Sequence, residues 1–373
     1  MKNQKMKIGF IGCGGFAGGN HIPNAAANPN FEIRAFCDLN EEQLKNLDAL
    51  YHPGYVTTDM NRIFSDPEIE TVICSTKPDF RLPIMRKAVE TGKHLFVEKP
   101  MCYKEDEVNG MVSLMNSSKI KFMVGFNRPF SPMMQDIKPY YRKLKGDGNT
   151  TVIYRIIGEA RLWPKHHHDA IVLEKESTII HEVTHIFNLL NWLTDLAPFR
   201  VYTVGGGNMD NVITLNYPDN VTAVIIAGDN SLTGFPKERI EIDSNFSAII
   251  GDEFIEMNVF GHEGTRARKT YDYKMGAETY NTSIAEATEK GWNWRRSVTE
   301  EEMAYGYYYK RQVKVDKGHS NELDMFRRWI QNEEPSQIDA VQGAIANLTA
   351  WRAIESWEKG TPVELDFSYL DKL

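Results

Sequence analysis

Hydrophobic and polar residues alternate in blocks along the first third of the chain. Short apolar runs are separated by stretches with helical spacing, such as 40–51 and 80–91. Continuous apolar strands divided by helices are typical of a parallel sheet covered on both faces. The pattern therefore predicts an α/β fold with a doubly wound parallel sheet. The apolar runs are MKIGFIG, FEIRAFC, ETVICST, HLFVEKP and IKFMVGF.

The pattern changes after about residue 126. Residues 177–193 have the spacing of an amphipathic helix, and later stretches such as VITLNY and ERIEID alternate with period two. Alternation predicts a second, α+β domain with a large, mostly antiparallel open sheet. We expect irregular, aromatic-rich structure over 260–316 and two helices near 319–332 and 337–358. The predicted domains are 1–125, which would bind a dinucleotide, and 126–373, which would bind substrate and oligomerise.

Composition and charge narrow the class of protein. The chain has 373 residues and a formal net charge of −8, which argues against a general nucleic-acid binder because such proteins need a basic face. No apolar stretch approaches the ~20 residues of a membrane span, and the N-terminal run is too glycine-broken for a signal peptide. We expect a cytoplasmic protein without membrane partners. Its four cysteines lack a C-x-x-C pair and are expected to be reduced core residues.

A glycine-rich turn follows the first strand. Gly12-Cys13-Gly14-Gly15-Phe16-Ala17 reads G-x-G-x-x-A and precedes a helical stretch, which is the context that a dinucleotide fingerprint requires. Gly12 permits the tight turn, Gly14 lets the backbone approach a pyrophosphate, and Ala17 keeps helix and strand close. The alternative is an ordinary glycine turn.

Asp38 ends the second strand at the spacing expected for a ribose ligand. A carboxylate there accepts hydrogen bonds from ribose hydroxyls and repels the extra phosphate of NADP, so we predict NAD as cofactor. The competing role, a helix cap, is better filled by Asn40 with Gln43 three residues on.

Glu98-Lys99-Pro100 follows the fourth apolar run. Ligands of open α/β sheets bind beyond the carboxyl ends of the strands, so a lysine there can face the cofactor and serve in acid–base chemistry. Pro100 makes a cis Lys–Pro bond accessible. A surface lysine in a turn is the alternative.

The chain resembles the Gfo/Idh/MocA family of oxidoreductases over nearly its whole length. The resemblance lies in G-x-G-x-x-A, Asp38, VETGKHLFVEKP, GFNRPFSP, THIFNLLNWL and the C-terminal NELDMFRRWI and AIANLTAWRAIESWEKGTPVEL. It implies a Rossmann domain, bound NAD(P), substrates that are sugars, inositols or their derivatives, and homo-oligomers, a dimer or tetramer, that form through the open sheet. It also implies that Lys99 and His185 are catalytic.

The expected site has a cofactor part and a substrate part. The expected cofactor residues are Gly12, Gly14, Gly15, Phe16, Ala17, Asp38, Ser75, Thr76, Glu98, Lys99 and Asn127. The expected substrate residues are Lys99, Arg81, Asn127, Arg161, Trp163, His181 and His185. His185 would remove the hydroxyl proton while Lys99 polarises the oxygen.

Three positions depart from the family pattern. Many members carry aspartates where this chain has His181 and Asn188, and a histidine where it has Arg81. Residues spaced by four and seven share a helix face, so His181, His185 and Asn188 are expected to lie together. These changes affect the expected substrate class more than the hydride chemistry.

His181-Glu182-Val183-Thr184-His185 is also a literal H-E-x-x-H, the motif of zinc peptidases. No third zinc ligand follows at the metzincin spacing, and a dinucleotide-binding fold would have no role in a peptidase. We therefore predict no metal, while His166-His167-His168 nearby keeps a metal site open as an alternative.

The sequence predicts an NAD-dependent enzyme that moves hydride between a secondary hydroxyl of a sugar, polyol or glycoside and the nicotinamide. The alternative is a glycosidase-like enzyme that uses NAD in transient redox steps. A metal-dependent hydrolase and a non-catalytic sugar sensor are less favoured. The aromatic run 271–309 would line either the substrate cleft or, preferably, an oligomer interface.

Overall fold

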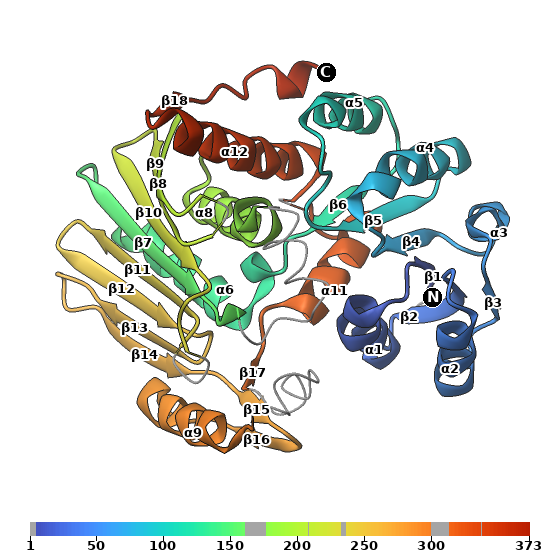
Figure 1. The fold of residues 1–373 in the computed structure, drawn as a ribbon, viewed down its shortest axis with the longest axis horizontal. Helices are drawn as coiled ribbons and strands as arrows, with labels where there is room; N and C mark the ends of the chain where they lie inside the picture. The colour runs from blue at the N-terminus through green and yellow to red at the C-terminus, as the bar shows by residue number, and fades with distance from the viewer. Residues whose placement is uncertain (1–4, 161–176, 208, 233–235, 300–312, 337) are drawn as a thin grey trace. The chain divides into compact units, whose positions relative to one another are not determined.

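The computed structural model describes residues 5–160, 177–207, 209–232, 236–299, 313–336 and 338–373. These residues form two compact units (Figure 1). Unit 1 comprises 1–127, 318–348 and 367–373, and unit 2 comprises 128–317 and 349–366. The sequence predicted a single domain boundary after residue 125. In the structure, two C-terminal segments, 318–348 and 367–373, also belong to the N-terminal unit. The first of these carries a helix that packs against the first helix of the chain.

Unit 1 is built on a six-stranded sheet in the order β3-β2-β1-β4-β5-β6. Its strand pairs are all parallel, which confirms the predicted doubly wound fold. The strands are β1 (Met6–Ile11), β2 (Phe31–Cys37), β3 (Tyr55–Thr57), β4 (Thr71–Cys74), β5 (His94–Glu98) and β6 (Phe122–Gly125). Five of them lie in the predicted apolar runs. The sixth, β3, is a three-residue edge strand too short to show a pattern.

Helices lie on both faces of this sheet, as the apolar strands required (Figure 1). The helices are η1 (Ala17–His21), α1 (Ile22–Ala27), α2 (Glu41–Tyr51), α3 (Met60–Ser65), η2 (Pro78–Phe80), α4 (Arg81–Thr91), α5 (Glu105–Asn116), α11 (His319–Ile330) and η8 (Leu370–Lys372). Helix α12 (Ala340–Lys359) begins in unit 1 and ends in unit 2. All four cysteines are buried and free, as predicted.

Unit 2 is built on a nine-stranded sheet in the order β14-β13-β12-β11-β7-β10-β9-β8-β18. Among the described strand pairs of this sheet, only β7 and β10 are parallel, which confirms the mostly antiparallel sheet. Its strands are β7 (Thr150–Ile157), β8 (Arg200–Gly205), β9 (Asn211–Tyr217), β10 (Val221–Gly228), β11 (Glu238–Ser244), β12 (Ser247–Asp252), β13 (Glu256–Phe260), β14 (Arg266–Thr270) and β18 (Val363–Glu364).

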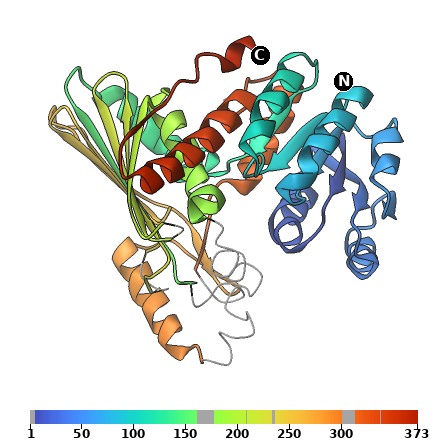
Figure 2. The same ribbon diagram turned by 45° about the horizontal axis from the view of Figure 1, so that its top comes forward.

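One face of the large sheet is covered by helices from the first part of unit 2 (Figure 2). These are η3 (Arg128–Phe130), α6 (Pro132–Leu144), η6 (Ile179–Val183) and α8 (Thr184–Thr194). Every residue of α8 is buried, so the predicted amphipathic character is wrong. A helix that is apolar on most sides is stable only when it is enclosed. Among the described helices, none combines the length and apolarity that a membrane span requires.

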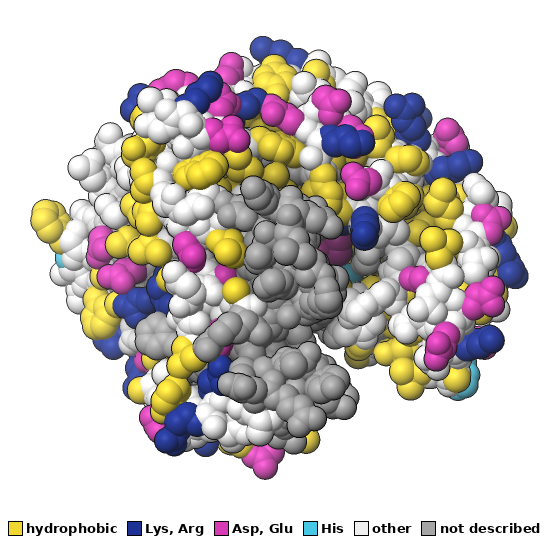
Figure 3. Space-filling view, in the orientation of Figure 1, with side chains coloured by type: hydrophobic (Ala, Val, Ile, Leu, Met, Phe, Trp, Pro, Cys, Tyr) yellow, Lys and Arg dark blue, Asp and Glu magenta, His cyan; other side chains and the backbone are white. Residues whose placement is uncertain are grey.

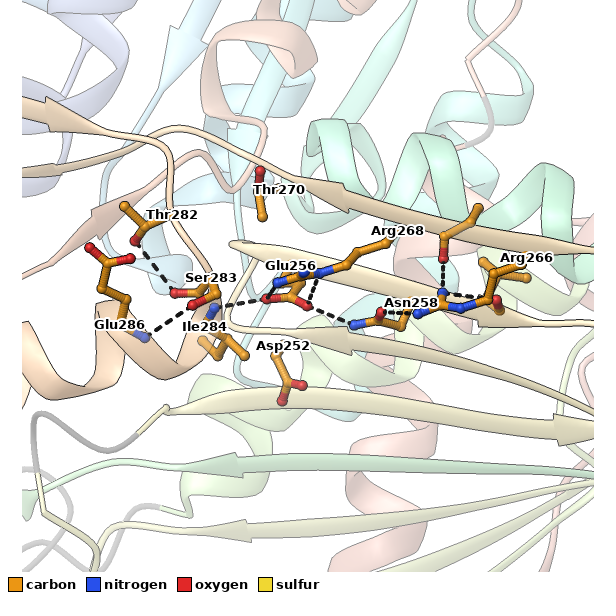
Figure 4. A network of polar contacts seen from close by, with 12 residues as sticks. Asp252, Glu256, Asn258, Arg266, Arg268, Thr270, Thr282, Ser283, Ile284 and Glu286 are labelled. Atoms are coloured by element: carbon orange, nitrogen blue, oxygen red, sulfur yellow. Dashed lines mark hydrogen bonds and ion pairs between the residues drawn. The ribbon is translucent and has the colours of Figure 1, made fainter.

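Residues 260–316, expected to be irregular, hold regular structure. They contribute β14, the three-stranded sheet of β15 (Tyr273–Met275), β16 (Glu278–Tyr280) and β17 (Lys314–Val315), and the helix α9 (Ile284–Ser297). The sequence carried a signal for α9, because Ser283 caps the helix and accepts a hydrogen bond from the N–H of Glu286. Glu256 of β13 accepts the N–H of Ile284 at 2.9 Å and so ties the helix to the sheet (Figure 4).

Candidate functional site

The expected cofactor residues follow neighbouring strands of unit 1. The turn at Gly12 follows β1, Ser75 and Thr76 follow β4, Glu98 ends β5 and Lys99 follows it, and Asn127 follows β6. Because β1, β4, β5 and β6 are adjacent and parallel, these segments lie along one carboxyl edge of the sheet. The strand order thus brings together residues spread over more than a hundred positions.

Gly12 is required by the backbone. Its φ is +83°, and an added Cβ would lie 2.9 Å from the backbone of Ser75 and Thr76. By contrast, a Cβ on Gly14 or Gly15 would meet no atom within 4 Å. Gly12 therefore allows the turn after β1 to lie against the segment after β4, whereas the two later glycines leave open space that a phosphate group can enter.

Asp38 stands directly after β2 and its carboxylate is held by backbone donors. The N–H of Cys13 donates to Oδ2 at 2.6 Å and the N–H of Asn40 donates to Oδ1 at 2.9 Å. Asn40 itself caps α2 by accepting the N–H of Gln43 at 3.1 Å, as predicted. The cap is thus supplied by Asn40, and the Asp38 carboxylate is oriented by the glycine turn.

A cavity of about 480 Å³ opens at this turn. It is lined by Gly14, Gly15, Gly18, Asp38, Asn40, Gln43, Asn46, Leu47, Leu50 and Tyr51. Its volume is within the range of small-molecule sites. A carboxylate beside open glycine backbone suits a ribose next to a phosphate, so these residues fit the nucleotide half of NAD.

The peptide bond between Lys99 and Pro100 is cis, the isomer that Pro100 made accessible. Oε2 of Glu98 accepts the N–H of Lys99 at 3.1 Å. On the other side of the bond, the Arg81 guanidinium donates to the carbonyl oxygen of Pro100 and, at 2.9 Å, to that of Thr76. The backbone around Lys99 is therefore held by hydrogen bonds to two buried charged side chains, Glu98 and Arg81.

These bonds occupy Arg81, which was expected to contact substrate. Only 2% of the residue is exposed. Burial lowers the pKa of its guanidinium, although arginine stays charged in proteins. A substrate contact would have to replace the bonds that Arg81 makes to the Lys99 loop, and that role stays a prediction.

Asn347 of α12 supports the same loop and was not expected from the sequence. Its Oδ1 accepts the N–H of Met101 at 3.0 Å, and its Nδ2 donates to the carbonyl oxygen of Cys102 at 2.9 Å. The sequence did contain a signal for this role, because Asn347 is a polar residue in the apolar stretch AIANLTA.

The second group of expected catalytic residues lies in unit 2. His181 is in the π-helical turn η6, and His185 is in the first turn of α8, where it is buried. Asn188, one turn further, is also buried, and its Oδ1 has no hydrogen-bond partner among the described residues. π-helical turns inside α-helices are frequent at functional sites.

Glu182, the glutamate of H-E-x-x-H, is held by cations. Its Oε1 accepts from Lys237 at 2.9 Å and from Arg128 at 3.3 Å. Arg128 also pairs with the buried Glu238 at 2.7 Å. Burial raises the pKa of Glu238, but Arg128 and Lys317 outweigh burial and hold that pKa well below its usual range. Glu182 thus belongs to a charge network and differs from the unpaired base of a peptidase.

Within the described part of the chain, a three-ligand cluster of metal-binding type occurs once, and it includes neither His181 nor His185. Arg161, Trp163 and the His166–His168 run lie outside the described residues. The proposed pairing of Lys99 with His185 draws one residue from each unit and stays a prediction.

The chain is similar to known oxidoreductases. The model of the Gfo/Idh/MocA family, described as an oxidoreductase family with an NAD-binding Rossmann fold, matches residues 6–126. The inositol 2-dehydrogenase/D-chiro-inositol 3-dehydrogenase of Lactiplantibacillus plantarum is 24% identical over 373 residues, which cover 97% of this chain and 94% of the relative.

Solved structures share the fold over the same length. An oxidoreductase from Agrobacterium radiobacter in complex with NAD+, L-tartaric acid and magnesium has a TM-score of 0.75 at 14% identity, covering 97% of this chain and 98% of that one. Apo scyllo-inositol dehydrogenase from Lactobacillus casei has a TM-score of 0.70 at 17% identity, covering 98% and 99%. The two-unit architecture is therefore shared over the full chain.

Proposed function

Because the chain belongs to the Gfo/Idh/MocA family of NAD-binding oxidoreductases, we propose that it oxidises a secondary hydroxyl of a sugar, polyol or glycoside. The observation that carries the proposal is the carboxyl edge of unit 1. There the Asp38 cavity and the loop of Lys99 follow strands of one sheet. Similarity over the whole chain to an inositol dehydrogenase supports a cyclic polyol or a related sugar as substrate.

In the proposed mechanism, Lys99 donates a hydrogen bond to the substrate oxygen and stabilises negative charge there. His185 accepts the hydroxyl proton as general base, and its burial limits exchange of that proton with water. Bound NAD supplies the hydride acceptor. Asp38 would bind the ribose hydroxyls of NAD, and Gly14 and Gly15 would leave room for its phosphates.

The substrate pocket is expected to differ from that of many relatives. His181 and Asn188 stand where many members carry aspartates, so the helix face presents neutral or cationic groups. A substrate with an acceptor-rich or anionic substituent would gain from this exchange, because these groups donate hydrogen bonds.

Two further properties are proposed. The chain forms homo-oligomers through the uncovered face of the nine-stranded sheet, where exposed hydrophobic side chains occur. It resides in the cytoplasm, because its four cysteines are free and buried, which suits a reducing compartment.

The test is to incubate the purified protein with NAD and a panel of inositols, aldoses and glycosides. Formation of reduced nicotinamide and release of free sugar are both followed. We expect reduction without cleavage for at least one polyol or sugar. Sugar release without net reduction would instead identify the transient-redox alternative.

Lys99→Ala and His185→Ala are expected to lower kcat by about 10²–10⁴, the usual contribution of a positioned acid–base group. The matched control is Lys104→Ala, since Lys104 is an exposed lysine five residues further on, paired with Glu107. Full activity in both site variants would refute the assignment of these residues.

A further inference from the structure

Three buried ionisable side chains meet inside unit 1, behind the Lys99 loop. They are His21 of η1, Glu98 of β5 and Glu322 of α11. Each contributes a nitrogen or oxygen atom, and these atoms all lie within 4.8 Å of one another. His21 and Glu322 are fully buried and Glu98 is 6% exposed. Nothing in the proposed mechanism uses His21 or Glu322.

The surroundings of the cluster are apolar. The His21 ring packs edge-on against the rings of Phe16 and Phe96, each at 5.3 Å between centroids. Phe96 in turn contacts Phe326, which lies on α11 one turn after Glu322. Charge is poorly solvated in such surroundings, so each charge in the cluster needs a partner.

Two carboxyl groups this close and this deeply buried cannot both be ionised. Among the described residues, no N–H or O–H group donates a hydrogen bond to either carboxyl oxygen of Glu322. Burial and the neighbouring Glu98 raise the pKa of Glu322 well above its usual value. For Glu98, burial also raises the pKa, but His21, Lys99 and Arg81 outweigh it and lower the pKa. The proton therefore resides on Glu322 and the negative charge on Glu98.

The short contact in the cluster is a hydrogen bond. Nε2 of His21 lies 2.5 Å from Oε1 of Glu98, so an ionised Glu98 accepts the proton of Nε2. Nδ1 of His21 has no hydrogen-bond partner in the described chain, which suits the neutral tautomer protonated at Nε2.

A metal ion would need a different geometry. One histidine and two carboxylates are a suitable donor set for zinc, whose bonds to such ligands are about 2.0–2.2 Å long. Two ligands of one tetrahedral ion then lie more than ~3 Å apart, since the bonds diverge. The 2.5 Å contact between His21 and Glu98 is shorter than this, so a proton fits the cluster and an ion does not.

We propose that Glu322 carries a proton that it shares with Glu98, and that Glu322 thereby acts as a positioning residue for Lys99. The link is Glu98, which accepts from His21 through Oε1 and from the Lys99 N–H through Oε2. An ionised Glu322 would repel the Glu98 carboxylate and push it away from the N–H of Lys99. A protonated Glu322 donates to it and holds it in place.

The proton is tested by stability, which needs neither substrate nor NAD. Glu322→Gln keeps the shape and a donor but cannot titrate. A carboxyl whose folded pKa is raised stabilises fully below its unfolded pKa of ~4.3, and that stabilisation is lost as pH rises through the folded pKa. Between these two pKa values, the unfolding constant of the wild type should rise about tenfold per pH unit relative to Glu322→Gln.

The measurement is denaturant unfolding of wild type and variant at a series of pH values from 4 to 9, in steps of about one unit across the range where the two pKa values differ. Glu358→Gln, at an exposed glutamate, is the control and should show no such trend. A flat difference, or a wild type that gains stability over the variant as pH rises, would overturn the proposal. So would a stoichiometric divalent ion that a chelator removes from the purified protein.

The positioning role, which rests on the proposed function, is tested by a second variant. Glu322→Leu removes the donor and is expected to lower kcat about tenfold with little change in KM, because Lys99 is displaced while the other substrate contacts remain. Glu322→Gln should recover most of that loss. Equal losses in both variants would refute the positioning role. Absence of activity in the wild type would refute the dehydrogenase proposal and leave the stability result standing.

Discussion

At the scale of single residues, the nucleotide cavity depends on how one carboxylate is held. Asp38 receives two backbone N–H groups, from Cys13 and Asn40, and these fix its orientation at the cavity wall. The carboxylate is therefore positioned before any ligand arrives, which lowers the entropic cost of binding.

Asp38→Ala should weaken the use of NAD and shift preference towards NADP. Hydrogen bonds to a charged group contribute about 1.5–3 kcal/mol, so the KM for NAD should rise by roughly tenfold or more. Loss of the negative charge removes repulsion of the NADP phosphate. Steady-state kinetics with both cofactors measure the effect. Asp48→Ala, at an exposed position of α2, is the control, and equal preference in wild type and Asp38→Ala would contradict the assignment.

At the scale of elements, α9 depends on a polar anchor. Glu256 accepts the N–H of Ile284 through Oε2, and its Oε1 accepts from Asn258 at 2.9 Å and from Arg268 at 2.8 Å (Figure 4). Burial raises the pKa of Glu256, but these donors outweigh it and the pKa is lowered. A single carboxylate therefore joins β13, β14 and the start of α9.

Glu256→Ala should destabilise the protein by about 1–3 kcal/mol, because three donors lose their acceptor. Since the folded pKa is depressed, this stabilisation is present above the unfolded pKa of ~4.3 and is lost as pH falls through the folded pKa. Denaturant unfolding at neutral and acid pH measures both effects. Glu263→Ala, at an exposed glutamate, serves as control, and a pH-independent difference would argue against an ionic anchor.

At the scale of the whole molecule, the uncovered sheet face carries the proposed oligomer contact. Val204, Val212 and Ile226 lie opposite one another on β8, β9 and β10, and each is 36–43% exposed. Figure 3 shows hydrophobic side chains among charged ones along the left margin, over the strands of this sheet. A row of exposed apolar residues on neighbouring strands is typical of an interface.

Val212→Lys should therefore shift the protein towards the monomer, because a lysine cannot be buried there without a partner. Sedimentation velocity over a range of concentrations measures the shift. Phe246→Lys is the control, since Phe246 is 94% exposed in the turn between β11 and β12. A wild type that stays monomeric at all concentrations would refute the proposed contact.

The features predicted well are those whose cause is local. The five apolar runs became strands because continuous burial on both faces needs continuous apolar sequence. Asn40 became a cap because its side chain reaches an N–H three residues away. The helix predicted over 177–193 is present as η6 and α8, but its amphipathic character was wrong, because every residue of α8 is buried. The prediction also missed α9, although Ser283 and Glu286 gave a local signal for the start of that helix; only the anchor on Glu256 is distant in sequence.

By itself, the sequence determined the doubly wound sheet, the turn at Gly12 and the place of Asp38, since each follows from local periodicity, backbone sterics or short-range hydrogen bonding. The tertiary structure alone decided the partners of His21, Glu98 and Glu322, which come from three distant segments. The charge of a carboxyl depends on what surrounds it, and only the folded chain encloses Glu322 beside Glu98. The fold also shows bonds that the sequence could not, since Arg81 donates to the backbone of Thr76 and Pro100 beside Lys99, while its predicted contact with substrate stays a prediction.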